Sequence, residues 1–197
     1  MTNRRGGEFL ITKRITLLLI SLVTAFSLVA CSTATKENDQ SSMDNMKQGN
    51  MSNMNHSSSG EIPKRLKEEK NPTYKVGSEV IVKADHMEGM NGAKATVVGA
   101  YDTTAYAVSY TPTTGGAKVT NHKWVIQEEI KNADNETLKP GTEVTLEADH
   151  MKGMMSTKGT IDLAEKTTVY MIDYTPTTGG EKVTNHKWVT ESELSTK

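Results

Sequence analysis

An internal repeat with a period of 64 residues constrains the fold of this chain more than any other feature. Residues 77–131 align without a gap with residues 141–195, and 31 of the 55 aligned positions are identical. A direct repeat of this length predicts two copies of one small structural unit rather than one large core. The low aromatic content of 5% agrees, because a single large core would need more bulky side chains.

Each repeat is predicted to consist of short β-strands separated by turns. In the first repeat, segments rich in Val, Thr and Tyr predict strands at residues 79–83, 93–99, 104–110 and 118–126. Turns are expected at residues 89–92, 100–103 and 112–116, and a single helical turn at residues 127–131. No apolar period of 3.6 residues argues for helices. We therefore expect an all-β fold made of two tandem small SH3-like barrels.

The first thirty residues are predicted to be an export signal. Arg4, Arg5, Lys13 and Arg14 precede an apolar run at residues 15–30, which is shorter than the ~20 residues of a bilayer-spanning helix. The run ends in Leu28-Val29-Ala30-Cys31, which resembles a bacterial lipobox. Lipidation of Cys31, the only cysteine, would anchor the mature chain on the outer face of the cell membrane. The alternative for Cys31 is a buried free thiol.

Composition divides the rest of the chain. Residues 32–59 hold almost no branched apolar or aromatic side chains, which predicts a disordered tether, and the charged residues 61–70 are expected to be a linker. The expected parts are a signal peptide at 1–30, a tether and linker at 31–70, and repeat domains at 71–133 and 134–197. A formal net charge of -1 argues against a nucleic-acid partner.

Methionine is unusually frequent, with eleven residues in the chain. Eight of them form Met-x-x-Met pairs: Met43/Met46, Met51/Met54, Met87/Met90 and Met151/Met154. Methionine usually fills gaps in a core, but the predicted tether has no core to fill. A thioether is a soft neutral ligand that prefers Cu(I) or Ag(I) to harder cations, and it forms no disulfide outside the cell. The methionine pairs therefore predict an extracytoplasmic copper(I) binder.

The five histidines support this interpretation because of where they lie. His56, His86 and His150 adjoin the methionine pairs, whereas His122 and His186 fall in a repeated Asn-His-Lys-Trp block. Imidazole suits copper in either redox state. We expect two folded sites, His86/Met87/Met90 and His150/Met151/Met154, and labile tether sites at Met43, Met46, Met51, Met54 and His56. His122 and His186 either complete these sites or pack at a barrel edge.

Two aspartates precede the first histidines of these sites. Asp85 and Asp149 either orient the neighbouring imidazole as carboxylate partners or begin a turn through their side chains. The repeated polar blocks also admit a different function, in which tandem barrels on a lipid anchor bind the cell wall or another protein. No catalytic motif is recognisable and a duplicated site suits binding, so we do not expect an enzyme.

The repeated blocks Asp-His-Met-x-Gly-Met, Tyr-Thr-Pro-Thr-Thr-Gly-Gly and Val-Thr-Asn-His-Lys-Trp-Val are long and specific. They resemble the YdhK-type family of surface lipoproteins, which includes the copper-resistance lipoprotein CopL. The resemblance covers both repeats from about Thr73 onward. It implies that the chain binds Cu(I) at the surface of a Gram-positive type cell and holds it before entry. Ag(I) and Cu(II) are the alternative ions.

Overall fold

The computed structural model describes residues 56–196, and within them the regular structure is β-strand apart from two single-turn 3-10 helices. The expected all-β fold class is therefore confirmed. Two long strands, β3 (Lys94–Tyr110) and β6 (Lys158–Tyr174), pair antiparallel along their whole length, and we call this pair the spine. The remaining elements are β1 (Lys67–Glu68), β2 (Glu79–Val82), β4 (Val119–Ile126), η2 (Gln127–Glu129), β5 (Glu143–Thr145), β7 (Val183–Thr190), η3 (Glu191–Glu193) and β8 (Leu194–Ser195).

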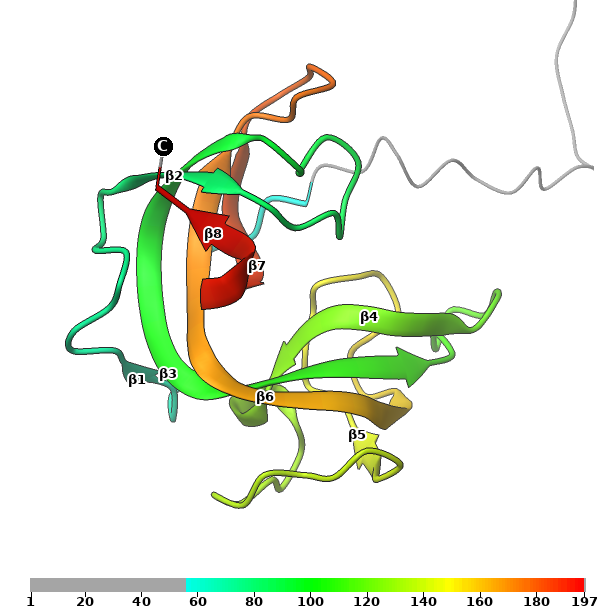
Figure 1. Ribbon diagram of the computed structural model, residues 1–197. Coiled ribbons are helices and arrows are strands. Elements are labelled where there is room, and N and C mark those ends of the chain that lie inside the picture. Colours follow the sequence, from blue (N-terminus) through cyan, green and yellow to red (C-terminus); the bar gives the residue numbers. More distant parts are fainter. Residues whose placement is uncertain (1–55, 197) are drawn as a thin grey trace, which may run out of the picture. The chain divides into compact units, whose positions relative to one another are not determined.

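The spine follows a curved path with shorter strands at both ends (Figure 1). The turn predicted at residues 100–103 is wrong, because these residues lie inside β3 and continue its pairing with β6. Tyr101 is opposite Val169 and Thr103 is opposite Thr167. Thr and Tyr have high β-propensity, and a long partner strand gives them a ladder to join. Each repeat therefore contributes one continuous spine strand instead of two short strands.

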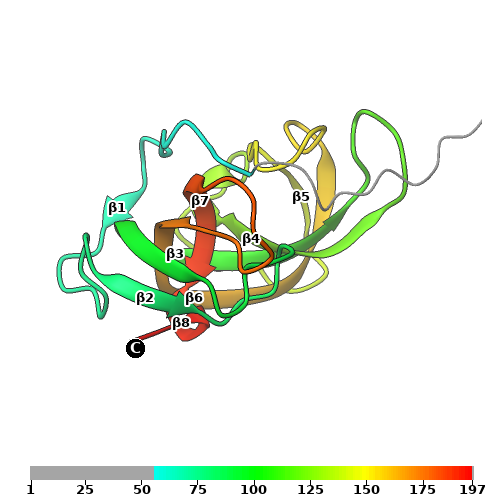
Figure 2. The same ribbon diagram turned by 90° about the horizontal axis from the view of Figure 1, so that it is seen from above.

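Each hydrophobic core combines strands from both repeats. At one end of the spine, β2 and the first half of β3 pack with the second half of β6, β7 and β8. At the other end, the second half of β3 and β4 pack with β5 and the first half of β6. Figure 2 shows these two ends from above. The repeat boundaries at 71–133 and 134–197 therefore do not coincide with the boundaries of the cores.

A third cluster of buried side chains joins the two ends at the middle of the spine. It contains both tryptophans, Trp124 and Trp188, which are 2% and 0% exposed. Both follow cis peptide bonds, from Lys123 and Lys187 respectively. Buried aromatic rings of this size dominate the energy of such a cluster. The tryptophans of the two repeats thus lie in one shared core rather than in two separate barrels.

The segment that precedes the first repeat, where a linker is expected at residues 61–70, is docked on the sheet. Leu66 is buried in the central cluster, and β1 pairs with residues 101–102 of β3. The guanidinium of Arg65 also donates a hydrogen bond to the carbonyl of Ala133 at 3.0 Å. The composition of the segment is charged, but one buried leucine and a short strand are enough to hold it.

Several expectations concern the N-terminal part of the chain, which lies outside the described residues. These are the signal peptide at 1–30, the lipidation site Cys31 and the tether ligands Met43, Met46, Met51 and Met54. No helix within residues 56–196 is long and apolar enough to cross a membrane.

Candidate metal site

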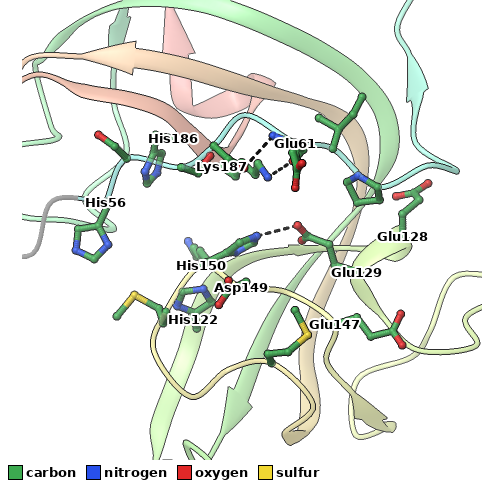
Figure 3. A pocket seen from close by; sticks show the side chains of 18 of the residues that line it. His56, Glu61, His122, Glu128, Glu129, Glu147, Asp149, His150, His186 and Lys187 are labelled. Atoms are coloured by element: carbon green, nitrogen blue, oxygen red, sulfur yellow. Dashed lines mark hydrogen bonds and ion pairs between the residues drawn. The ribbon is translucent and has the colours of Figure 1, made fainter.

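All five histidines line one cavity of about 720 Å³ between the two ends of the spine. They are His56, His86, His122, His150 and His186. Figure 3 shows four of them on one side of the cavity together with Asp149, and glutamate side chains on the other side. The ring centroids of His122 and His150 are 6.2 Å apart. The two sites expected to be separate therefore face a common space.

A strand irregularity directs His122 and His186 into this cavity. Asn121 and Asn185, which precede them, have φ angles of 51° and 52°. Asparagine tolerates this left-handed conformation better than most residues. The register of β4 against β3 and of β7 against β6 shifts on both sides of each histidine. His122 lines the cavity while Trp124 packs in the central cluster, although simple alternation predicts one shared face for them.

The loops that carry His86 and His150 are held by the repeated turn of the opposite repeat. The backbone N–H of Thr177 donates to the carbonyl of Gly89 at 2.8 Å, and that of Thr113 donates to Gly153 at 2.9 Å. A Cβ on Gly89 would lie 2.5 Å from Thr178 Oγ1, so only glycine fits this approach. The Thr-Pro-Thr-Thr-Gly-Gly turns thus fix the loops of the candidate site.

Each of these two histidines binds a glutamate from the other repeat. His86 Nε2 lies 2.7 Å from Glu193 Oε1, and His150 Nε2 lies 2.8 Å from Glu129 Oε1. Asp85 and Asp149, considered above as the carboxylate partners, are not the groups that pair with the imidazoles here. The neighbouring aspartates lie on the same loops as the histidines, whereas the glutamates follow β4 and β7 and approach from across the spine.

Several buried imidazole nitrogens lack a hydrogen-bond partner within residues 56–196. They are Nε2 of His56, Nδ1 of His86, Nε2 of His122 and Nδ1 of His150. A buried polar atom without a partner costs about 1–3 kcal/mol. Four such atoms around one cavity require partners that these residues do not supply, such as water molecules or a bound ligand.

Burial keeps two of the imidazoles uncharged. Desolvation, and secondarily the other histidines nearby, lower the pKa of His122 to about 3 and that of His186 to about 3. The ring of His186 also packs edge-on against Tyr174, with centroids 5.6 Å apart. A neutral imidazole has a free lone pair, which is the form that binds a metal. Both side chains are thus ready to act as ligands at neutral pH.

The two methionines of each Met-x-x-Met pair in the repeats lie in different places. Met87 and Met151 line the cavity, as does Met155, which replaces Asn91 of the first repeat. Met90 and Met154 are fully buried in the two end cores and are not among the cavity-lining residues. The structure therefore brings His86 and His150 together with one thioether each, and not with both members of a Met-x-x-Met pair.

The charge of the cavity favours a cation. Five acidic side chains line it against three lysines. The acidic residues are Glu61, Glu128, Glu129, Glu147 and Asp149, and the lysines are Lys64, Lys123 and Lys187. In the described part of the chain, no three His, Cys, Asp or Glu side chains are already arranged as a metal-ligand set. An ion would have to draw the donors inward.

The sequence reasoning missed Glu129 and Glu193. The alignment of the two repeats could have indicated them. After Val125 and Val189, these glutamates are the only aligned pair that is identical. A glutamate that is retained among otherwise divergent neighbours indicates a specific contact. Its partner could not be identified from the repeat alone, since the contact joins one repeat to the other.

Comparison with known proteins places the chain in a family. Residues 76–127 and 140–191 match a family described as "Protein of unknown function (DUF1541)". The chain is 56% identical over 198 residues to the uncharacterized protein YdhK of Bacillus subtilis (strain 168), covering 100% of this chain and 95% of that protein.

Solved structures agree with this assignment. A crystal structure of the Bacillus subtilis DUF1541 family protein YdhK superimposes with a TM-score of 0.71 at 67% identity, covering 74% of this chain and 99% of the other. A solution structure of the YdhK C-terminal domain superimposes with a TM-score of 0.60 at 70% identity, covering 62% and 93% of the two chains. The chain belongs to the DUF1541 family, as a tandem-repeat relative of YdhK.

Proposed function

We propose that this chain is an extracytoplasmic copper(I)-binding lipoprotein. It is anchored through Cys31 at the outer face of the cell membrane, sequesters copper there and contributes to copper resistance. The observation that supports the proposal most is the cavity itself. There, four buried imidazole nitrogens that have no partner among residues 56–196 accompany the thioethers of Met87 and Met151.

The chemistry of these donors favours a soft monovalent ion. Imidazole binds Zn²⁺ as well as copper, so the thioether is the donor that discriminates. A neutral thioether suits Cu(I) and Ag(I) better than Zn²⁺, Mg²⁺ or Ca²⁺. The acidic residues of the cavity add a favourable potential for any cation. Cu(I) is the ion we propose, and Ag(I) and Cu(II) are the comparators in its test.

Binding in the cavity involves no turnover, so the protein acts as a sequestering agent and not as an enzyme. His86 with Met87 and His150 with Met151 supply the loop ligands, and His122 and His186 supply strand ligands from β4 and β7. His56 adds an imidazole from the segment before the first repeat. Met43, Met46, Met51 and Met54 of the tether provide further, more labile sites.

A competition experiment against a chromogenic Cu(I) chelator tests the proposal on the soluble mature chain. The double variant Met87→Leu/Met151→Leu removes the two cavity thioethers that adjoin His86 and His150 and leaves that of Met155. We expect its cuprous affinity at the folded site to fall at least tenfold. The matched control is Met90→Leu/Met154→Leu, which changes the same residue type in the end cores. A Met-to-Leu exchange in a core costs less than about 1.5 kcal/mol, so the control should fold and bind as the parent does.

Two results would contradict the proposal. The first is that the parent chain takes up no Cu(I). The second is that the Met87→Leu/Met151→Leu variant keeps the full Cu(I) affinity and stoichiometry of the parent. Repeating the titration with Ag(I) and Cu(II) establishes which ion the cavity prefers. If the Met90→Leu/Met154→Leu variant lost more Cu(I) affinity than the Met87→Leu/Met151→Leu variant, the ligands would be those of the Met-x-x-Met sites expected from the sequence.

A further inference from the structure

Glu129 and Glu193 are each held by three hydrogen bonds. In addition to His86, Glu193 accepts from the indole N–H of Trp124 at 2.8 Å and from the backbone N–H of Thr190 at 2.9 Å, both at Oε2. Such a carboxylate cannot rotate without losing all three donors.

The second glutamate repeats this arrangement. Oε2 of Glu129 accepts from the indole N–H of Trp188 and from the backbone N–H of Ile126, both at 3.1 Å. Its Oε1 faces His150. The side chain of Glu129 is 6% exposed, so solvent offers it little alternative. The same geometry in both halves indicates a role that the two halves share.

This geometry determines which histidine nitrogen can bind a metal. An ionised carboxylate only accepts hydrogen bonds, so Nε2 of His86 and of His150 must carry the proton that lies between the two groups. In the neutral ring the lone pair is then on Nδ1. Nδ1 of both residues is buried and has no hydrogen-bond partner within residues 56–196. Both residues line the cavity, and this nitrogen is the one that each ring has left for a metal ion.

We propose that Glu129 and Glu193 are positioning residues that make Nδ1 the ligating atom of His150 and His86. This inference deepens the proposed function and rests on it. Because each glutamate comes from the repeat that does not carry its histidine, neither repeat can complete its own half of the site. Trp124 and Trp188 fix the glutamates and thereby connect the central core to the cavity.

The tautomers of the metal-free protein provide the first test. Long-range ¹H–¹⁵N correlation spectra distinguish a proton on Nδ1 from a proton on Nε2, and we expect the Nε2–H form for both His86 and His150. This measurement needs no variant and no metal. Finding the Nδ1–H form at either residue would overturn the proposal.

The variant Glu193→Gln provides the second test. Its amide oxygen is required by Trp124 and Thr190, so its amino group faces His86 and donates to Nε2. The ring must then carry its proton on Nδ1, which blocks the ligating atom. We expect the tautomer of His86 to change while that of His150 does not, and cuprous affinity to fall 10–100-fold.

Glu191→Gln is the matched control, because Glu191 lies in the same 3-10 turn but accepts from Tyr170 and contacts no histidine. It should leave both tautomers and the affinity unchanged. If Glu193→Gln keeps parental affinity in a chain that binds Cu(I), the positioning role is wrong while the proposed function survives. If the parent shows the expected tautomers but binds no Cu(I), the proposed function fails, and the positioning role fails with it.

Discussion

At the scale of single residues, the properties of the cavity depend on histidines that are kept neutral. Burial is the main reason that the pKa of His122 and of His186 is lowered from the ordinary value of 6.5 to about 3. Such rings release no proton when they bind a metal at neutral pH. The same burial lowers the free energy of unfolding in acid, because the two imidazoles bind protons in the unfolded chain but not in the folded chain.

Stability of the metal-free protein should therefore fall as the pH decreases from 6.5 towards 3. In that range the unfolded state binds protons at His122 and His186 that the folded state does not, so the free energy of unfolding rises with pH. Each histidine contributes a slope of at most about 1.4 kcal/mol per pH unit. Urea unfolding at pH 7.0, 5.5 and 4.5 measures the slope.

The variant His186→Phe isolates one of the two contributions. Phenylalanine keeps an aromatic ring against Tyr174 but cannot take up a proton. The slope between pH 7.0 and 4.5 should decrease, and it should decrease again when His122→Phe is added. An unchanged slope in the double variant would show that other groups cause the acid sensitivity.

At the scale of elements, local patterns predicted what short segments do. The strands expected at residues 79–83 and 118–126 correspond to β2 and β4, and the helical turn expected at 127–131 corresponds to η2. The turn expected at 100–103 failed because the conformation there depends on β6, whose paired residues lie about 65 positions later in the chain. Local propensity contains no information about such a partner.

In the candidate site, too, the sequence predicted the local features but not those that depend on distant parts of the chain. The sequence identified the histidines and the soft thioethers, because both residue types recur at fixed positions. It placed them in two separate sites, since nothing in a repeat shows that β3 and β6 pair along their full length. It also grouped Met90 with Met87, although Met90 occupies the core. Spacing along a loop does not reveal which side chain points inward.

The loop that carries His86 offers a test of how one element positions another. Gly89→Ala places a Cβ 2.5 Å from Thr178 Oγ1 and 2.9 Å from Pro176 Cβ, at a φ of +75°. We expect a loss of about 1 kcal/mol for the backbone conformation and about 1–3 kcal/mol more for the clash. Cuprous affinity should fall as well, because His86 and Met87 move with the loop.

Gly115→Ala is the control for this variant. Its φ is +80°, but no atom lies within 4 Å of the added Cβ. Gly115→Ala should therefore lose only the stability that the positive φ costs an alanine, and it should keep the parental Cu(I) affinity. Thermal unfolding and chelator competition measure both quantities, and equal losses in the two variants would contradict the account of the loop contact.

At the scale of the whole described molecule, the two repeats are interlocked. Their spine strands cross both cores, their tryptophans share the central cluster, and each of His86 and His150 is held by the other repeat. The strands of the two repeats correspond in pairs, whereas the segment before the first repeat, which includes β1, has no counterpart among the described residues. Residues 56–63, which we call the strap, supply His56 to the cavity and have no counterpart before the second repeat.

The strap is docked on the second repeat. The backbone N–H of Ser58 donates to the carbonyl of Thr184 at 3.0 Å, and the amide of Asn185 donates to the carbonyl of Ser58 at 3.3 Å. The ammonium of Lys187 donates to the carbonyl of Glu61. These contacts hold His56 at the cavity, although residues 56–59 belong to the segment predicted to be a disordered tether.

Asn185→Gly should loosen the strap without disturbing β7. Asn185 and Asn121 have nearly the same left-handed φ, which glycine adopts freely, so Asn121→Gly is a matched control that alters no strap contact. We expect the Ser58 amide to exchange its hydrogen at least tenfold faster in Asn185→Gly, and Cu(I) to dissociate faster to a chelator. Both rates should stay at the parental value in Asn121→Gly. Because His56 is the one histidine outside the repeats, equal rates in the two variants would mean that the strap takes no part in retaining the ion.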